Sequence, residues 1–397
     1  MEDKEPPYEI DKDNVLGKGS FGVVYKAKHN YFIKEDMQNT EIVALKKLPK
    51  EIKEDQEKLA SLTNEILIST KINENINDDE DEIQLFDKKD YKEHLVKFID
   101  IANIEDDLYL AYEFCNGGDL KRYLKYFKAF DEKMIQCIMK QIIQGLNILH
   151  ERKIFHHDLK PENILVDLRD KDGKPLPEEK IQTIMEITNP KNKALNKDES
   201  IMKNSELLEI LFNSKMKISD FGLSKLAEDI VDKEVSGSPL YIDPNSLENE
   251  SNIETIENEK VDIWALGIIA YELFFYDLPF QPFPPSIDKL KECFKKGQYT
   301  IDLLKHKEVS KEFLMFLDMC LQREQKIRPL TDELLYCEFI IREPDKFVKL
   351  NINNYTDKKI AEYPDDSYTK EKGKITMNID NNRMLNAYFD GGNHPKK

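Results

Sequence analysis

The sequence predicts an α+β protein, with a small β-rich N-terminal part that contains one key helix and a larger, mainly helical C-terminal part. Three observations predict this class. Residues 8–48 alternate apolar and polar positions around a glycine cluster, residues 131–150 carry apolar side chains at helical spacing, and residues 260–340 hold several further helical patterns. With 397 residues, the chain is long enough for two domains or for one bilobal domain with extensions.

The N-terminal part is predicted to be a small sheet interrupted by a helix. Residues 8–48 indicate two or three antiparallel strands, residues 50–72 a helix, and residues 94–114 (HLVKFIDI, then LYLAYEF) further strands. An acidic stretch at 73–93 precedes these later strands and contains the run DDEDE at 78–82. Such a charge run favours a solvated insertion, and binding of a basic partner is the alternative.

The C-terminal part is predicted to be helical with one large insertion. From Asp131 to His150, apolar residues recur at helical spacing, and a core-facing stripe explains them most simply. The stripe consists of Ile135, Ile138, Ile142, Leu146 and Leu149. Residues 167–214 are polar and are predicted to form a surface insertion with room for short helices. Residues 345–397 are rich in Asn, Lys and Asp, which predicts a flexible tail.

Composition and charge argue against several classes of protein. The formal net charge is −18, so the chain is a poor candidate for wrapping nucleic acid, whose phosphates it would repel. The five cysteines are scattered and lack CxxC spacing, which favours reduced thiols in an intracellular compartment. The N-terminus has no apolar core, and no apolar run approaches the roughly 18 to 20 residues that span a bilayer. We therefore expect no signal peptide, no transmembrane segment, and a cytoplasmic protein for which access to the nucleus stays open.

A glycine cluster follows the first predicted strand. Gly17, Gly19 and Gly22 form a GxGxxG pattern, and glycines let a backbone approach phosphate oxygens without Cβ clashes. In a Rossmann fingerprint such a cluster stands between a strand and a helix. Here more strand follows (VVYKAKH), which favours a hairpin that covers phosphates, although a plain glycine-rich turn is the alternative.

A lysine in the next apolar strand indicates an anionic partner. Lys46 ends the run VALK, and an unpaired ammonium inside an apolar strand is costly. A wet strand edge is the alternative, and it suits Lys47 better than Lys46. Glu65 on the following helix is the candidate partner, with Glu57 as the main competing acid. A glycine-rich loop, a VAIK-type lysine and a helix glutamate together resemble the protein kinase family.

The segment IFHHDLKPENIL at 154–165 resembles the HRDLKPEN catalytic loop of that family over almost its full length. Asp158 can accept a hydrogen bond from an attacking hydroxyl and orient it. Lys160 can neutralise charge on the transferring phosphoryl group, and Asn163 offers an oxygen ligand to Mg²⁺. The DLKPEN form resembles the serine/threonine kinases, which implies Ser and Thr hydroxyls as acceptors.

Later motifs extend the resemblance. Asp220-Phe221-Gly222 matches the DFG motif, which implies that Asp220 is the main Mg²⁺ ligand. GSPLYI at 237–242 resembles the loop that seats the acceptor peptide, where Ser238 stands at the position of a hydroxyl that bonds the catalytic aspartate and lysine. VDIWALG at 261–267 matches the DxWxxG helix, in which Asp262 would hold the backbone of the catalytic loop.

The resemblance also implies where ATP binds. The adenine ring would lie between apolar side chains and bond the hinge backbone, with Tyr112 as gatekeeper, although a stripe such as LYLAYEF is by default a core strand. The implied ATP-binding residues are Gly17, Gly19, Gly22, Val24, Ala44, Lys46, Glu65, Glu113, Cys115, Asp119 (at the ribose) and Leu165. The implied catalytic residues are Asp158, Lys160 and Ser238, and the implied Mg²⁺ ligands are Asn163 and Asp220.

Two positions depart from the family pattern. His157 replaces the arginine of HRD, which in many kinases pairs with a phosphorylated residue of the activation loop. A histidine, with an ordinary pKa of about 6.5, is a weaker substitute, so we hypothesise activation that depends little on loop phosphorylation, for example at Ser236. Asn245 replaces the glutamate of APE, which in the family pairs with a buried arginine, here Arg328. An asparagine cannot neutralise that charge, which favours a looser anchor unless Asp243 compensates.

The resemblance covers roughly residues 8–340 and implies a bilobal protein kinase fold. We predict an N-terminal extension at 1–7 and a kinase domain at 8–344, followed by the tail. Within the domain, the N-lobe is expected at about 8–114 and the C-lobe at about 115–344, with the insertions at about 73–93 and 167–214.

The implied function is ATP- and Mg²⁺-dependent phosphorylation of Ser or Thr in protein substrates, with the tail or insertions as sites for regulatory proteins. EFCNGGDLKRYL and GSPLYIDP resemble the autophagy-initiating ULK-type kinases, which implies a role in autophagy or nutrient signalling. The main alternative is a pseudokinase scaffold that binds ATP without turnover, which His157 and Asn245 motivate. A small-molecule or lipid kinase on a related fold is the third class, and the GSPLY segment argues against it.

Overall fold

The computed structural model describes most of the residues of the chain. They are 7–19, 22–30, 42–50, 56–73, 88–192, 202–226, 238, 240–248, 258–279, 288–289, 292, 309–347, 349–350, 368–371 and 374–377. The acidic run at 78–82, Ser236 and most of the predicted tail lie outside the described residues. The predictions for these segments therefore stay predictions.

The chain divides into two compact units. The first unit comprises Met1–Phe127 and Cys137–Ile230, and the second comprises Lys128–Gln136 and Val231–Lys397. The strands of the predicted N-lobe and the predicted catalytic loop both belong to the first unit. The lobe boundaries expected near residues 114 and 344 remain predictions.

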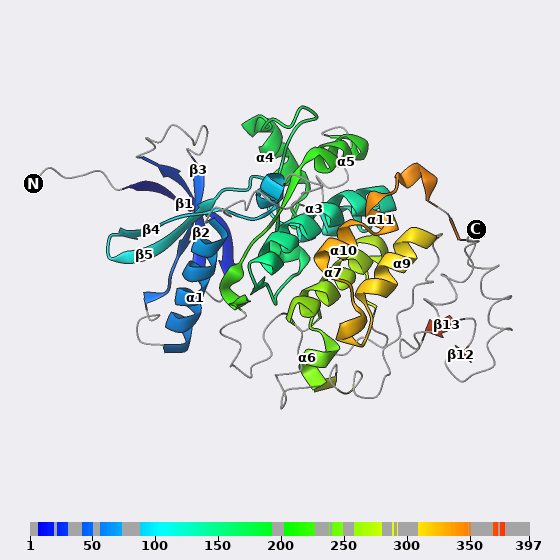
Figure 1. The fold of residues 1–397 in the computed structure, drawn as a ribbon. Helices are drawn as coiled ribbons and strands as arrows, with labels where there is room; N and C mark the ends of the chain where they lie inside the picture. Colours follow the sequence, from blue (N-terminus) through cyan, green and yellow to red (C-terminus); the bar gives the residue numbers. More distant parts are fainter. Residues whose placement is uncertain are drawn as a thin grey trace, which may run out of the picture. The chain divides into compact units, whose positions relative to one another are not determined.

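A five-stranded antiparallel sheet forms the N-terminal part of the first unit (Figure 1). Its strands are β1 (Tyr8–Gly19), β2 (Gly22–His29), β3 (Ile42–Lys47), β4 (Phe98–Ile104) and β5 (Asp107–Glu113), in the order β1-β2-β3-β5-β4. Every neighbouring pair of strands is antiparallel. The strands expected within 8–48 and 94–114 are therefore confirmed. β1 and β2 pair up to Gly19 and Gly22, so the glycine cluster stands at the end of a hairpin, as predicted.

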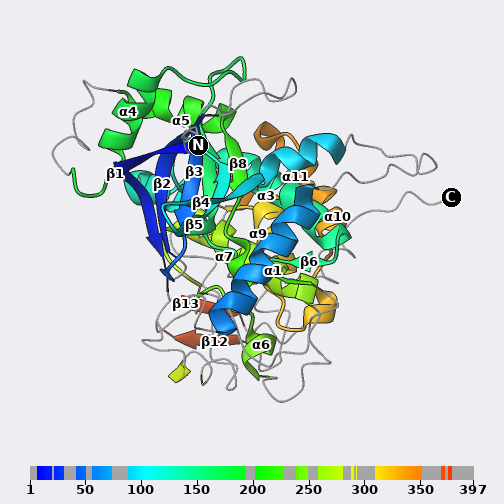
Figure 2. The same cartoon turned by 90° about the vertical axis from the view of Figure 1, so that its left-hand side faces the viewer.

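The alternation of side chains along β3 separates the core from the site. Val43 and Leu45 are fully buried, whereas Ala44 and Lys46, which alternate with them, point to the opposite face and are half-buried. The helix α1 (Gln56–Asn73) follows β3 and lies beside the sheet in both views (Figures 1 and 2). Its Leu62 packs in a cluster with residues from the sheet and from the end of β3, namely Leu48, Phe98 and Leu110.

Short strands in the rest of the first unit bring two predicted motifs together. Its elements are η2 (Lys88–His94), α2 (Leu120–Phe127), most of α3 (Glu132–Glu151), β6 (Ile154–Phe155), η3 (Pro161–Asn163), β7 (Ile164–Asp167), β8 (Lys215–Ile218), η5 (Phe221–Leu223) and β9 (Lys225–Leu226). β6 pairs with β9, and β7 pairs with β8. The segment between β6 and β7 thus lies next to the segment between β8 and β9. The apolar stripe predicted on α3 is fully buried along its whole length.

The polar insertion predicted at 167–214 contains two helices, α4 (Glu178–Ile187) and α5 (Asn204–Asn213). Both helices bury apolar residues within the first unit. Arg122 of α2 donates a hydrogen bond to the carbonyl of Met185 at 3.0 Å, and Lys26 of β2 pairs with Glu178 at 3.2 Å. The insertion is therefore attached both to the sheet and to α2, and the expectation of short helices in it is confirmed.

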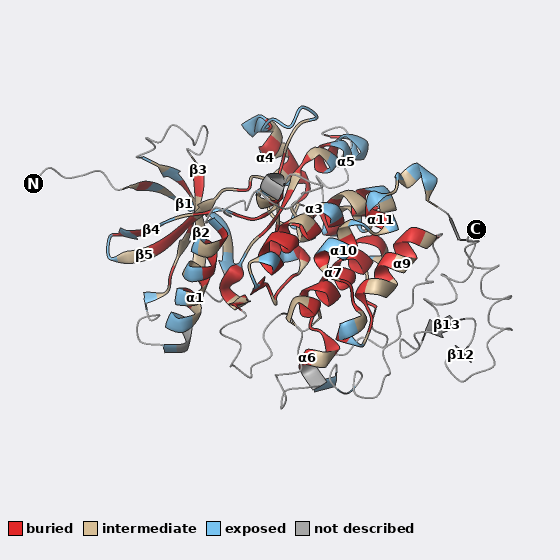
Figure 3. Cartoon of the chain, viewed as in Figure 1, coloured by how far each residue is buried: buried red, intermediate tan, exposed pale blue. Residues whose placement is uncertain are grey.

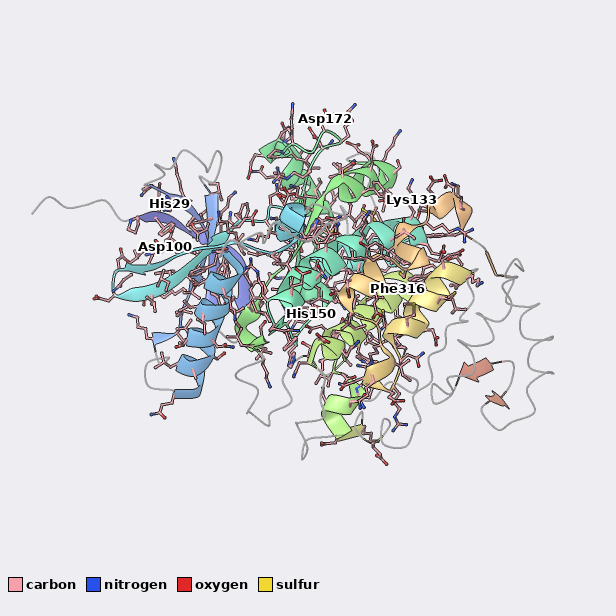
Figure 4. All side chains as sticks on the ribbon, viewed as in Figure 1. His29, Asp100, Lys133, His150, Asp172 and Phe316 are labelled. Atoms are coloured by element: carbon pink, nitrogen blue, oxygen red, sulfur yellow. The ribbon has the colours of Figure 1, made fainter. Side chains whose placement is uncertain are left out.

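The second unit is mainly helical, as expected for 260–340. Its elements are α6 (Pro244–Glu248), α7 (Asn258–Phe275), β10 (Val309–Ser310), α9 (Lys311–Cys320), η8 (Gln325–Ile327), α10 (Thr331–Leu335), α11 (Glu338–Ile341), η9 (Pro344–Lys346), β11 (Lys349–Leu350), β12 (Tyr368–Glu371) and β13 (Lys374–Met377). α7 is buried on all sides from Lys260 to Phe274 (Figure 3). Phe316 of α9 (Figure 4) lies 5.2 Å from Phe339, between ring centroids, in the surrounding core. Among the helices of the described residues, none is long and apolar enough to cross a membrane.

Candidate active site

Lys46 and Glu65 form a buried ion pair in the first unit. Lys46 Nζ lies 2.6 Å from Oε1 and 2.8 Å from Oε2 of Glu65. The two side chains are 12% and 4% exposed, so both charges are largely removed from water. A buried ammonium requires such a partner. The pairing expected between the β3 lysine and the α1 glutamate is confirmed, and the side chain of Glu57 is not among those described.

The same helix holds the segment that follows Asp220. Ser61 Oγ donates to the carbonyl of Gly222 at 2.9 Å, and Asn64 Nδ2 donates to the carbonyl of Ser224 at 2.6 Å. Asp220 takes a left-handed backbone conformation, with φ 64° and ψ 74°, and is exposed. Few residues other than glycine adopt this conformation, and such strain is concentrated at functional sites. α1 therefore positions both the ion pair and the DFG segment.

The predicted catalytic loop gathers two donors on one carboxylate. Asp158 is 7% exposed, and its Oδ2 accepts hydrogen bonds from Lys160 Nζ at 2.6 Å and from Asn163 Nδ2 at 3.0 Å. Asn163 Nδ2 also donates to the Asp158 carbonyl at 2.8 Å. The carboxylate is thereby held in one orientation beside an ammonium. A general base that acts next to a phosphoryl group needs such an arrangement.

His156 joins the catalytic loop to the DFG segment. Its ring is fully buried, its Nδ1 accepts from the Asp158 N–H at 3.2 Å, and its Nε2 lies 3.0 Å from the Ser219 carbonyl oxygen. Because Nδ1 accepts, the ring proton is on Nε2 and donates to that carbonyl. Ser219 in turn donates from its N–H at 2.9 Å and its Oγ at 3.0 Å to the Asn163 carbonyl. One network thus fixes the backbone on both sides of the site.

At Gly22 of the glycine cluster, only glycine fits. Gly22 has φ +132°, and a Cβ there would lie 2.0 Å from the Lys47 carbonyl oxygen. At Gly17 a Cβ would meet nothing within 4 Å. Gly19 pairs with Gly22 across the hairpin end. The close approach of β2 to the Lys47 carbonyl therefore requires glycine at position 22, whereas Gly17 leaves open space beside the strand.

The side chains predicted to contact adenine from the sheet share one face. Val24 pairs with Lys46 across β2 and β3, and Ala44 pairs with Tyr112 across β3 and β5. Directly opposite residues of antiparallel strands point to the same face of the sheet, so these four side chains lie on one face. Leu165 on β7 is half-buried between two fully buried neighbours. An apolar side chain with a free surface at this position suits contact with a planar ligand.

The hinge residues and Asp119 have protein partners of their own. The Glu113 carboxylate pairs with Lys217 at 3.0 Å, and Cys115 is 8% exposed, so burial raises the pKa of its thiol. A ligand would therefore meet the backbone of these two residues rather than their side chains. Asp119 Oδ1 accepts from the Arg122 N–H at 2.9 Å at the start of α2. Burial raises the pKa of the Asp119 carboxyl, and this hydrogen bond opposes the rise.

Comparisons with known proteins agree with this geometry. The protein kinase domain family matches residues 10–182 and 195–340. Serine/threonine-protein kinase ULK1 of Homo sapiens is 25% identical over 338 residues, which are 85% of this chain and 26% of that protein. Serine/threonine-protein kinase ULK3 of Homo sapiens is 27% identical over 314 residues, which are 79% of this chain and 51% of that protein. Serine/threonine-protein kinase ppk11 of Schizosaccharomyces pombe is 26% identical over 92% of this chain and 93% of its own length.

The chain belongs to the protein kinase family. The family match covers most of the chain, so the α+β kinase fold predicted from the sequence is confirmed. The similar proteins are serine/threonine kinases, and the domain is accordingly a serine/threonine protein kinase domain. The chain spans only 26% of ULK1 and 51% of ULK3, so the roles of those whole proteins do not transfer with the domain.

Asn163 and Asp220 fit the Mg²⁺ site of a kinase. Because Asn163 Nδ2 donates to Asp158, the amide oxygen is the atom that a cation would meet, and exposed Asp220 adds a carboxylate. Mg²⁺ prefers such oxygen ligands. In the part of the chain that the structure describes, no group of three or more His, Cys, Asp and Glu residues could hold a metal ion. Mg²⁺ at these two residues would therefore rely on phosphate oxygens of ATP as further ligands.

Two further residues of the predicted kinase pattern lie in the second unit. Ser238 is half-buried, and its carbonyl accepts from the Tyr241 N–H at 2.9 Å. Asp262 is fully buried on α7. The contacts that the kinase pattern implies between these residues and the catalytic loop remain predictions.

The arginine anchor of the kinase domain is present in altered form. Arg328 is 1% exposed and pairs with Asp243, which is fully buried. Gln325 Nε2 and the Ser246 N–H also donate to Asp243, at 2.8 and 3.0 Å. Asn245 Oδ1 accepts from Arg328 at 3.3 Å. Asp243 therefore compensates for the missing glutamate, a question that the sequence left open.

The structure adds two functional groups whose roles the sequence does not reveal. His156 is part of the catalytic string, and its position two residues before Asp158 is the signal that could have found it. Tyr112 is the predicted gatekeeper, and its hydroxyl in addition donates to Glu65 Oε1 at 2.7 Å. No local pattern indicates that second contact, because its partner is 47 residues away.

Proposed function

We propose that this chain is an active enzyme that transfers the γ-phosphoryl group of ATP to Ser or Thr hydroxyls of protein substrates. The convergence of Lys160 and Asn163 on the Asp158 carboxylate carries the proposal. The Lys46–Glu65 pair and Asp220 belong to the same unit and supply the remaining charged groups that the reaction needs. A scaffold without turnover has no need to keep all of them.

Each residue has a defined role in the proposed reaction. Asp158 accepts the hydrogen bond of the acceptor hydroxyl and takes its proton as the new bond to the γ-phosphorus forms. The bond between that phosphorus and the β,γ-bridging oxygen breaks, and ADP leaves with the negative charge. Lys160 neutralises charge on the transferring group, while Lys46, oriented by Glu65, holds the phosphates. Mg²⁺, held by Asn163 and Asp220 when bound, screens the phosphate charge.

The test is phosphate transfer from Mg-ATP to a generic protein and to a Ser/Thr peptide library. Asp158→Asn should lower the transfer rate by about 10² to 10⁴-fold, because it removes the proton acceptor and keeps the shape of the side chain. Asp172→Asn is the matched control, since Asp172 is exposed in a turn of the insertion (Figure 4). Transfer that is lost in the first variant and kept in the second supports the proposal.

A pseudokinase that binds ATP without turnover is the alternative. His157, with a left-handed φ of 61°, still motivates it, whereas the argument from Asn245 is weakened by the Asp243–Arg328 pair. No transfer by the wild-type protein with any divalent ion, while ATP still binds, would establish this alternative. Activation without loop phosphorylation stays a separate hypothesis, and equal activity of Ser236→Ala and wild type would support it.

For the cellular role we propose autophagy or nutrient signalling in the cytoplasm, with protein substrates and regulatory partners. The resemblance of EFCNGGDLKRYL and GSPLYIDP to ULK-type kinases supports this role, and proteins named ULK1 and ULK3 are among the similar ones. Loss of the protein should then impair autophagic flux on starvation in its own cells. Unchanged autophagic flux would contradict the proposed role in autophagy, but it would not affect the proposal that the protein is an active kinase.

A further inference from the structure

The Tyr112 hydroxyl makes a third hydrogen bond to the glutamate of the central ion pair. Tyr112 lies on β5, and its hydroxyl donates to Glu65 Oε1 at 2.7 Å. Lys46 Nζ donates to the same oxygen at 2.6 Å and to Oε2 at 2.8 Å. These two donors to the carboxylate come from different strands, β3 and β5. The tyrosine ties α1 to the sheet at the residue that orients the lysine.

The surroundings make this hydrogen bond consequential. Glu65 is 3% exposed, and a carboxylate so far removed from water depends on its donors. Burial and the charge of Glu65 raise the pKa of Tyr112 far above its ordinary value. The neutral phenol is therefore favoured, and it is this form that can donate to the Glu65 carboxylate.

The tyrosine ring contributes an apolar contact at the same place. It packs edge-on against Phe98 with 5.5 Å between ring centroids. It also packs against the cluster that contains Leu62 of α1 and Leu110 of β5. Tyr112→Phe replaces only the hydroxyl by hydrogen and keeps this packing. It therefore separates the contribution of the hydrogen bond to Glu65 from that of the ring packing.

We propose that Tyr112 is a positioning residue for phosphoryl transfer, acting through Glu65 on the orientation of Lys46. The sheet thereby contributes its own anchor for α1, in addition to the contacts of α1 with the DFG segment. This inference rests on the proposed function of the site, in which Lys46 holds the phosphates. Tyr112 need not contact the reacting atoms for this role.

The test is a double-mutant cycle of Tyr112→Phe, Glu65→Gln and the double variant, measured by kcat and by KM for ATP. Tyr112→Phe should lower kcat by about tenfold and change KM for ATP by less than about threefold, because the lysine is misplaced in the transition state more than in the ground state. In the Glu65→Gln background, Tyr112→Phe should have little further effect, since the residue through which it acts is already altered.

Tyr109→Phe is the matched control. Tyr109 lies on the same strand and is 5% exposed, but it belongs to the buried cluster on the other face of the sheet with Val43 and Leu45. Its substitution should leave kcat close to the wild-type value. Wild-type kcat in Tyr112→Phe, or effects of the two substitutions that multiply in the double variant, would overturn the inference.

Amide hydrogen exchange of α1 gives a readout that does not depend on turnover. Tyr112→Phe should raise the exchange rate around Glu65 in the ATP-free protein, and Tyr109→Phe should leave it unchanged. If the wild type transfers no phosphate but this exchange difference appears, the proposed function fails while the anchoring of α1 by Tyr112 stands. Unchanged exchange in Tyr112→Phe overturns the anchoring whether or not the enzyme turns over.

Discussion

Arg328 is surrounded by partners that a single substitution can disturb. Its guanidinium lies 4.9 Å from the centre of the Trp264 ring and donates to the carbonyls of Gln322 and Lys260 at 2.7 and 2.9 Å. Asp243 supplies the negative charge. Carbonyl dipoles and a ring face can orient a guanidinium, but a carboxylate is needed to offset the cost of removing a full charge from water.

Asp243→Asn should therefore lower the free energy of unfolding by about 3 to 5 kcal/mol, because it leaves a buried guanidinium without its counter-charge. Asn245→Ala removes only one hydrogen bond at 3.3 Å and should cost about 1 kcal/mol. Urea unfolding of both variants and the wild type measures the difference. Similar losses in the free energy of unfolding for the two variants would show that the charge of Asp243 does not stabilise buried Arg328.

At the scale of elements, a half-buried histidine joins η2 to β8. His94 ends η2, and its Nδ1 lies 3.1 Å from the Met216 carbonyl oxygen on β8. Burial lowers the pKa of His94 from 6.5 to about 4, and the hydrogen bond to Met216 opposes that fall. The nearby charges of Lys215, Lys217 and Glu93 act more weakly on it.

This shift makes the stability of the first unit depend on pH. Because the pKa of His94 is lower in the folded state, the unfolded chain binds the proton first as the pH falls. The stabilisation that comes from neutral His94 is fully present above about pH 6.5 and is lost as the pH falls toward 4. At pH 5 this loss lowers the free energy of unfolding by about 2 kcal/mol. Urea unfolding at pH 7 and pH 5 should show a larger loss for the wild type than for His94→Asn, whose amide can still donate to Met216. Equal losses in the two proteins would contradict this assignment.

At the scale of the whole molecule, the polar groups of the predicted ATP site belong to one unit. Lys46, Glu65, Asp158, Asn163 and Asp220 all lie in the first unit, although the chain leaves it at 128–136 and returns. A ligand that binds these groups stabilises the fold that holds them together. Nucleotide binding can therefore be followed through stability, without any reference to turnover.

Mg-ATP at a concentration of 100 times its Kd should raise the free energy of unfolding of the wild type by about 2.7 kcal/mol. Lys46→Met should lose most of this gain, because the charge that holds the phosphates is absent. Lys12→Met is the control, since Lys12 is an exposed lysine of β1, 73% accessible. Thermal unfolding with and without Mg-ATP measures this increase in stability. If Mg-ATP stabilised Lys46→Met as much as the wild type, Lys46 would not take part in binding ATP.

Predictability from the sequence depends on the distance between contacting residues along the chain. Asp158, Lys160 and Asn163 lie within six positions, so a single string of the sequence is enough to place them together. For Lys46, the sequence left two candidate partners, Glu65 and Glu57, and the structure pairs it with Glu65. The hydroxyl of Tyr112 and the charge of Asp243 acquire their roles from distant residues, which no local pattern indicates.

The sequence by itself determined the kinase family and the fold class, and it predicted which segment forms the catalytic loop, because periodicity and adjacent motif residues are properties of short segments. The tertiary structure decided which acid neutralises Arg328, how the insertion helices attach to Arg122 and Lys26, and that the Tyr112 hydroxyl bonds Glu65. Alternation along a strand or helix shows which face is buried, but the partner of a buried charge is set by the packing of segments that are remote in the chain.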